Sequence, residues 1–238
     1  MGRFSRLTFG REELPKRCII YAGAYVPQRK NWVRSVFDEW NRIEGTWVKY
    51  AFATREGKEY LLVYNVYGGA VALELLQLLK DGNVKKVFFV GSLGGKDLPI
   101  GTIVVPTRVV DKAGIVSVDT PHMQIVKPEE KYLKKLREVL RRLRIDFFEG
   151  KIASVPCVLH NINHIKELVE KDSSIVGVEI ETSTFYYYSQ KEGFENYALL
   201  YVSDNKKYDI IDQAQHVKEV RKNALRTITR VATETLKQ

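Results

Sequence analysis

Long apolar runs are missing from this sequence of 238 residues. Nowhere do about 18 apolar residues, the length that a membrane-spanning helix needs, follow one another without a charge. The first six residues contain two arginines and no apolar segment like that of a secretory signal peptide. We therefore expect a cytoplasmic protein that makes no contact with a membrane.

Cysteine is also scarce, since Cys18 and Cys157 are the only two. Two cysteines cannot by themselves supply the four ligands of a structural zinc site. Both lie in apolar stretches typical of buried strands. The sequence thus predicts inert, reduced thiols in the core and no bound metal.

Charge of one sign is in excess, because 38 Lys and Arg stand against 29 Asp and Glu, for a net charge of +9. Much of it lies in residues 127–144, which hold eight Lys or Arg and three Glu. The apolar residues of this segment recur at helical spacing. A nucleic-acid interface is the alternative, but no aromatic residues are interleaved with the charges. We therefore predict an amphipathic helix with a solvated face and no nucleic-acid partner.

Linkers rich in Pro or Ser, internal repeats and low-complexity tracts are absent. Short apolar runs alternate instead with helical patterns, which predicts an α/β protein. We expect a single domain over residues 1–238, with a mixed, twisted central sheet flanked by helices. Strands are predicted at residues 18–21, 47–54, 60–66, 86–90, 102–105, 147–159, 175–178 and 198–202, and helices at residues 31–43, 69–80, 127–144, 162–171, 181–190 and 212–237.

Small and acidic residues follow four of the predicted strands. In an open α/β sheet the ligand site lies at the carboxyl ends of the strands, so these positions are the first candidates. The glycine loops, taken alone, fit plain turns better than phosphate or sugar sites. The residues at the four positions are Gly68 and Gly69, Gly91 and Ser92, Glu179 and Glu181, and Ser203 and Asp204.

The acidic residues among these are the more informative. At least one carboxylate of Glu179 and Glu181 must face the interior end of the sheet, where it suits the two neighbouring hydroxyls of a ribose. The alternative is a cap for the helix that follows. Burial of Asp204 at the end of an apolar strand would raise its pKa toward that of a general acid. The alternative for Asp204 is an ordinary cap or turn residue.

The order of these motifs resembles that of the nucleoside phosphorylase superfamily, which includes purine nucleoside phosphorylases, uridine phosphorylases and related nucleosidases. The resemblance covers roughly residues 60–238. It rests on a Gly-Gly pair before a helix, Gly-Ser-x-Gly-Gly at 91–95, Gly-Thr-Ile-Val-Val-Pro at 101–106, Gly-Val-Glu-Ile-Glu-Thr at 177–182, and Val-Ser-Asp-Asn at 202–205.

The resemblance implies a role for each matching residue. Glu181 would hold the ribose hydroxyls over Ile180, and Asp204 would protonate a purine base at N7. Ser92 would contact phosphate. Other residues implied to lie against the substrate are Glu179, Ser203, Gly68, Gly69, Gly91 and His160. The implied reaction is phosphorolysis of a purine nucleoside to free base and ribose 1-phosphate, with phosphate as co-substrate, no cofactor, and a homo-oligomer that is a dimer or hexamer.

Two departures from the pattern keep alternatives open. Phe89 occupies the position of a phosphate-binding arginine, and no Gly-Asp-Pro-x-Arg motif follows the first strand. Any phosphate would therefore depend on another basic residue, Arg29 or Lys49, with Arg55 as a further choice. A nucleosidase that hydrolyses a nucleoside or an AMP-type substrate is one alternative. A nucleoside-binding protein without catalysis is the other.

Overall fold

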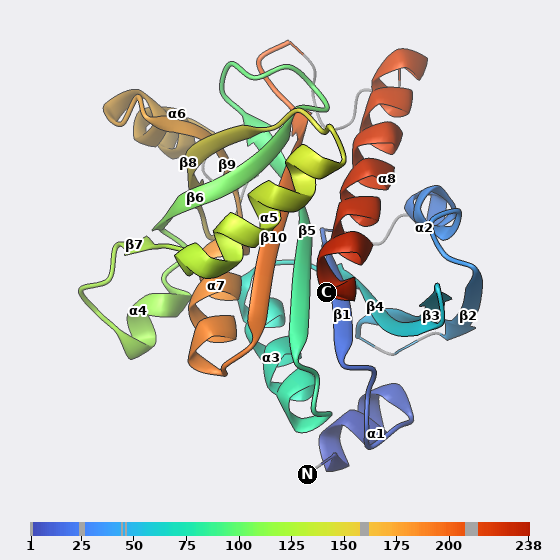
Figure 1. Ribbon diagram of the computed structural model, residues 1–238. Coiled ribbons are helices and arrows are strands. Elements are labelled where there is room, and N and C mark those ends of the chain that lie inside the picture. The colour runs from blue at the N-terminus through green and yellow to red at the C-terminus, as the bar shows by residue number, and fades with distance from the viewer. Residues whose placement is uncertain (1, 24–26, 44, 46, 158–161, 208–213) are drawn as a thin grey trace.

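Parallel strands form the centre of the sheet in the computed structural model, which describes residues 2–23, 27–43, 45, 47–157, 162–207 and 214–238 (Figure 1). The order of the central strands is β10 (Glu195–Asp204), β5 (Lys86–Gly95), β1 (Arg17–Ala22) and β4 (Lys58–Val66), and all adjacent pairs are parallel. Their apolar runs are almost entirely buried, as is typical of strands covered on both faces.

One half of the sheet closes on itself. β10 also pairs antiparallel with β6 (Ile103–Asp111), which pairs in parallel with β8 (Phe148–Ser154). β8 then pairs in parallel with β9 (Ile175–Glu179), and β9 returns to the end of β5 through Gly94 and Gly95. This closure brings the segment after β9 to the carboxyl end of β5.

Antiparallel strands extend the two sides of the sheet. β3 (Lys49–Arg55) forms a hairpin with β4 and also pairs with β2 (Glu39–Ile43). The short β7 (Ile125–Val126) pairs with β6.

Helices cover both faces of the sheet (Figure 1). α3 (Gly69–Asp81) and α7 (Thr182–Lys191) pack together on one face, with α1 (Arg3–Phe9) and α4 (Ile115–Asp119) beside them. α5 (Glu130–Arg142), α8 (Gln215–Lys237) and α2 (Pro27–Arg34) share the core of the other face, and α6 (Ile162–Lys171) lies beside β9. The predicted α/β class, with a mixed sheet flanked by helices, is confirmed.

The basic segment forms the predicted amphipathic helix as α5. Its apolar stripe is buried against β10 and α8, while most of its charged residues face outward. None of the helices that the structure describes is long and apolar enough to cross a membrane.

The predicted helix over residues 31–43 is wrong. α2 ends at Arg34, and residues 39–43 form β2. Trp32, Val36 and Trp40 do pack against one core cluster, so their spacing correctly indicated burial. Pairing with the neighbouring hairpin fixes residues 39–43 as a strand, a non-local contact that overrides the helical period.

Two predicted strands ended too early. β5 continues through residues 91–95, so the predicted glycine loop is part of the strand. β6 passes through Pro106, where the pairing with β8 shifts register, as expected for proline at a bulge. Cys18 is buried as predicted, but Cys157 lies beyond the end of β8 and is exposed.

Candidate functional site

The carboxyl ends of β4, β5 and β10 meet at one edge of the sheet, because these strands run parallel through β1. This edge is the upper one in Figure 1. α3 begins there after β4, and the segment between β9 and α7 arrives beside the end of β5. Residues far apart in the sequence are therefore brought together at this edge.

Glu181 contacts the start of α3 directly. The backbone N–H of Gly68 donates a hydrogen bond of 2.8 Å to Oε1 of Glu181. Gly68 has φ 89° and ψ 155°, a conformation that is essentially restricted to glycine. Glu181 is only 4% exposed, and a backbone hydrogen bond from Ile180 also reaches its carboxylate. The carboxylate is thus oriented at the start of α3 by Gly68.

Glu179 has a different environment, because both of its oxygens are engaged within the chain. Its Oε2 accepts hydrogen bonds from the N–H groups of Glu181 and Thr182, at 2.8 and 2.7 Å, and from the Thr182 hydroxyl at 2.8 Å. Its Oε1 accepts one from the hydroxyl of Ser154. Glu179 therefore holds the start of α7 in place, which is the capping role that the sequence left open as the alternative to ribose binding.

A buried chain of polar groups, which we call the Glu179 network, continues behind this carboxylate. The Ser154 hydroxyl accepts a 2.9 Å hydrogen bond from the N–H of Ser183, and the Ser183 hydroxyl donates one of 2.8 Å to Asp111. Sequence reasoning missed these three residues. A signal was present for Asp111, which ends an apolar strand in the same way as Asp204.

Burial and charge perturb the titration of both glutamates. Burial raises the pKa of Glu179, and the hydrogen bonds that it accepts act in the opposite direction. Burial, followed by the charge of Glu179, raises the pKa of Glu181 to about 8. Because Glu179 has four donors and Glu181 has fewer, Glu179 is the carboxylate that retains the negative charge.

Asp204 lies at a bulge at the end of β10. Val202 pairs with Leu93 and Asp204 with Gly94, so Ser203 is the additional residue. The Ser203 hydroxyl donates a 2.5 Å hydrogen bond to Asp204 Oδ1. A Cβ atom placed on Gly94 would lie 3.1 Å from Asp204 Oδ2, so glycine leaves room for the carboxylate.

Gly94 links Asp204 to the glutamates. It pairs with Val178, whose Cγ2 would lie 3.7 Å from the same added Cβ atom. Val178 is three residues before Glu181. Asp204 and the glutamate segment therefore flank the same position of β5.

Ser92 lies two residues before Gly94, on the same face of β5, and is partly exposed. Gly91 faces the core instead, because a Cβ atom there would lie 2.4 Å from Leu200. Phe89 is fully buried, and its ring stacks on Phe185 with 4.9 Å between centroids. The position that carries an arginine in the phosphorylase pattern is thus part of the apolar core.

Not all of the remaining predicted site residues lie at this edge of the sheet. Lys49 pairs with Tyr64 near the end of β4, hence near this edge, and its Nζ donates to the Gly45 carbonyl at 3.2 Å. Arg55 pairs with Lys58 at the opposite end of the hairpin, away from this edge. Ile180 is buried between the two glutamates. His160 and the side chain of Arg29 lie outside the described residues.

No metal centre is formed by the residues that the structure describes, since no three His, Cys, Asp or Glu side chains gather closely enough to hold an ion. The arrangement provides the Glu181 carboxylate near the start of α3, the Asp204 carboxyl at the end of β10 and the Ser92 hydroxyl on β5. Such a set can hold a polyol and exchange a proton with a second group.

Comparison with known proteins identifies the family. Residues 31–237 match the sequence profile of the phosphorylase superfamily. The chain belongs to the phosphorylase superfamily. The predicted resemblance is thereby confirmed, although no curated protein matches the sequence significantly.

Solved structures show the same phosphorylase superfamily fold. Uridine phosphorylase from Vibrio fischeri ES114 has a TM-score of 0.78 at 18% identity, over 94% of this chain and 93% of that chain. Purine nucleoside phosphorylase from Toxoplasma gondii has a TM-score of 0.77 at 16% identity, over 95% and 94% of the two chains. The 5′-methylthioadenosine/S-adenosyl homocysteine nucleosidase of Campylobacter jejuni has a TM-score of 0.73 at 16% identity, over 92% and 97%. At these identities the likeness establishes the fold.

Proposed function

We propose that this protein cleaves the N-glycosidic bond of a purine nucleoside and transfers the ribose to phosphate. The observation that carries the proposal is the buried carboxylate of Glu181, fixed by the Gly68 N–H at the sheet edge where Asp204 ends the adjacent strand. Membership of the phosphorylase superfamily supports the same reaction class.

Glu181 is the residue that we assign to the ribose. A carboxylate accepts two hydrogen bonds at once, and the 2′- and 3′-hydroxyls of a ribose are a matched pair of donors. Two such donors stabilise the ionised carboxylate, which is otherwise disfavoured by burial and by Glu179. Binding of the sugar should therefore be coupled to loss of the Glu181 proton near neutral pH.

Asp204 is the residue that we assign to the base. Cleavage passes through an oxocarbenium-like sugar, so the departing purine must be neutralised as the bond breaks. A protonated carboxyl at Asp204, held by the Ser203 hydroxyl, would donate to N7. Gly94 gives that carboxyl its space on β5.

Phosphate is the acceptor in this proposal. The Ser92 hydroxyl, the first-turn N–H groups of α3 from Gly69 onward and the ammonium of Lys49 all lie toward the same edge. Free N–H groups at the start of a helix are suited to an oxyanion. Lys49 supplies a positive charge in place of the arginine that the phosphorylase pattern has at residue 89.

Hydrolysis is the second candidate, and two observations favour it. Phe89 is buried against Phe185 and offers no phosphate contact. The Gly68 N–H donates to Glu181 and so is not free for phosphate. Beside these observations, the similar structure from Campylobacter jejuni is a nucleosidase by its name. In this case water would take the place of phosphate beneath the anomeric carbon.

The test is release of free base from inosine, adenosine, uridine and AMP, each with and without phosphate. Phosphorolysis predicts purine release that needs phosphate and yields ribose 1-phosphate. Release that is equally fast without phosphate would establish hydrolysis instead. If no base is released while a nucleoside still binds, the protein is a binding protein and the proposed reaction is wrong.

A further inference from the structure

A hollow in the surface lies far from the candidate active site. It has a volume of about 520 Å³ and sits between the end of α2, the β3–β4 turn and α8. We call it the α8 pocket. It is lined by Ser35, Val36, Asp38, Arg55, Glu56, Asn223, Arg226, Thr227 and Arg230. Arg55 marks the end of the β3–β4 hairpin opposite to the edge that carries Glu181 and Asp204.

The wall formed by α8 presents unpaired polar groups. Asn223, Arg226, Thr227 and Arg230 are spaced by three and four residues and so share one face of the helix. Among the described residues, none of their side chains has a hydrogen bond or ion pair, and Ser35 across the pocket has none either. Two arginines four residues apart also repel each other, which an intervening anion would relieve.

The acidic side chains of the pocket, in contrast, already have hydrogen-bond or ion-pair partners within the chain. Asp38 accepts a 2.6 Å hydrogen bond from the N–H of Glu56. The Glu56 carboxylate contacts Lys237 and lies 3.7 Å from Arg55.

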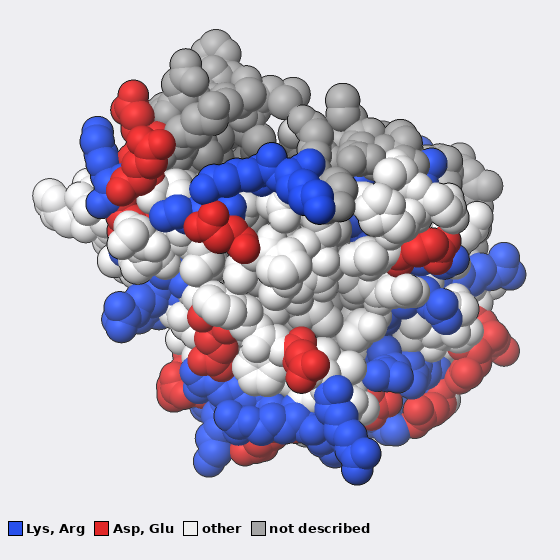
Figure 2. All heavy atoms as spheres, turned by 90° about the horizontal axis from the view of Figure 1, so that it is seen from above, with Lys and Arg blue, Asp and Glu red and all other residues white. Residues whose placement is uncertain are grey.

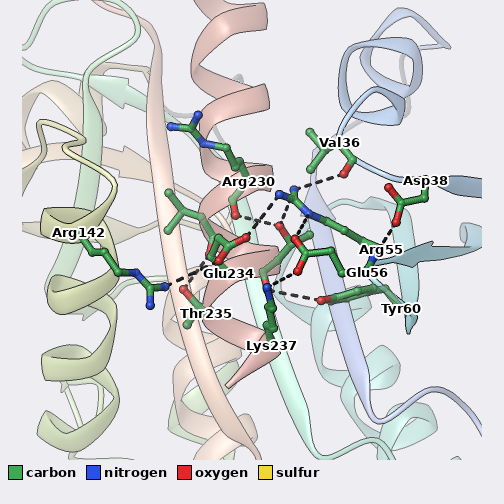
Figure 3. Close-up of polar contacts among 12 residues, drawn as sticks. Val36, Asp38, Arg55, Glu56, Tyr60, Arg142, Arg230, Glu234, Thr235 and Lys237 are labelled. Carbon is green, nitrogen blue, oxygen red and sulfur yellow. Dashed lines mark hydrogen bonds and ion pairs between the residues drawn. The ribbon is translucent and has the colours of Figure 1, made fainter.

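Arg55 is itself held in place. It donates to the Thr233 hydroxyl at 3.0 Å and forms an ion pair of 3.4 Å with Glu234. Figure 3 shows this network with the Arg230 guanidinium outside it. Among the described residues, Arg226 and Arg230 are therefore the basic side chains of the pocket that form no ion pair.

Basic side chains also occur outside the pocket. Figure 2 shows Lys and Arg side chains along its lower margin, with Asp and Glu side chains close by. Two guanidinium groups with nearby hydroxyl and amide groups are suited to phosphate oxygens, which arginine binds through paired N–H donors. The volume lies within the range of small-molecule sites, and the polar lining disfavours an apolar ligand.

We propose that the α8 pocket binds a small molecule through its phosphate groups, held by Arg226 and Arg230. This ligand is distinct from the nucleoside and from the phosphate co-substrate, because the pocket lies at the other end of the β3–β4 hairpin from the Glu181 edge. It occupies the pocket whether or not the protein cleaves nucleosides.

Pyrophosphate is the probe for this site, with binding measured by calorimetry at fixed ionic strength. The test variant is the double substitution Arg226→Ala and Arg230→Ala. The matched control is Lys134→Ala with Arg141→Ala, which removes the same charge from exposed positions of α5. We expect the test variant to weaken binding at least tenfold, the control to change it less than twofold, and neither to alter base release.

Three results would overturn the proposal. The first is equal affinity of the wild type and the test variant. The second is binding that disappears in Ser92→Ala, which would place pyrophosphate in the candidate active site. The third is absence of pyrophosphate binding while heparin binds in a manner that requires Arg226 and Arg230, which would make this surface a site for a macromolecular polyanion.

Discussion

Replacing Glu181 with Gln should change how folding stability depends on pH. Glutamine has nearly the shape of a protonated glutamic acid and can still accept the Gly68 N–H. It cannot ionise. In the folded wild type, burial and the charge of Glu179 raise the pKa of Glu181 to about 8. The substitution therefore removes the cost of a buried charge without removing the contact.

The magnitude follows from linkage. The folded state binds the Glu181 proton more tightly than the unfolded state, so protonation of Glu181 adds to the free energy of unfolding. This contribution to stability is fully present below pH 4.5. It is lost as the pH rises through about 8. A pKa that moves from 4.5 to about 8 on folding corresponds to roughly 4–5 kcal/mol of stability. Rearrangement around Glu179 should relieve part of that cost. We therefore expect the free energies of unfolding of the wild type and Glu181→Gln to differ by about 3 kcal/mol near pH 9.

Urea denaturation of both proteins between pH 5 and pH 9 measures this difference. Near pH 5 the two free energies of unfolding should be similar, and near pH 9 Glu181→Gln should be the more stable protein. Glu138→Gln, on the exposed face of α5, is the control and should follow the wild type at every pH. A constant difference between wild type and Glu181→Gln across the range would refute the reasoning.

Substitutions at three further positions test other parts of the structure. Phe89→Arg should lower the free energy of unfolding by more than about 3 kcal/mol, because it buries a charge, whereas Phe89→Leu should lower it by about 1 kcal/mol. A stable Phe89→Arg protein with an increased affinity for phosphate would contradict this. Gly68→Ala should cost about 1–3 kcal/mol by urea denaturation, because of its φ of 89°, and an unchanged free energy would contradict it. Asp204→Asn should slow purine release at least 100-fold with little change in KM, and a normal kcat would exclude Asp204 as the acid.

Much of the fold could be predicted because its signals are local. The apolar stripe of α5 and the continuous apolar runs of β5 and β10 each indicate their structure within a short window of sequence. Residues 39–43 could not be predicted in this way. Their helical spacing is an accident of which residues are apolar, and their conformation depends on pairing with β3.

The candidate site was predictable only in outline. The sequence indicates two glutamates after a buried strand, but it cannot show which one caps the helix. That depends on Ser154, which lies 25 residues before Glu179 in the chain. Likewise, the sequence shows that Phe89 replaces an arginine, whereas its stacking on Phe185 is visible only in the fold. Long-range side-chain contacts decide both roles.

The central claim is that Glu181 and Asp204 act on one bound nucleoside. A crystal structure of the Asp204→Asn variant with inosine tests it most directly, because slow cleavage would preserve the substrate. The account predicts the ribose hydroxyls on Glu181 Oε2 and N7 of the base beside residue 204 in the same molecule. A nucleoside bound elsewhere, or one that contacts only one of these two residues, would contradict it.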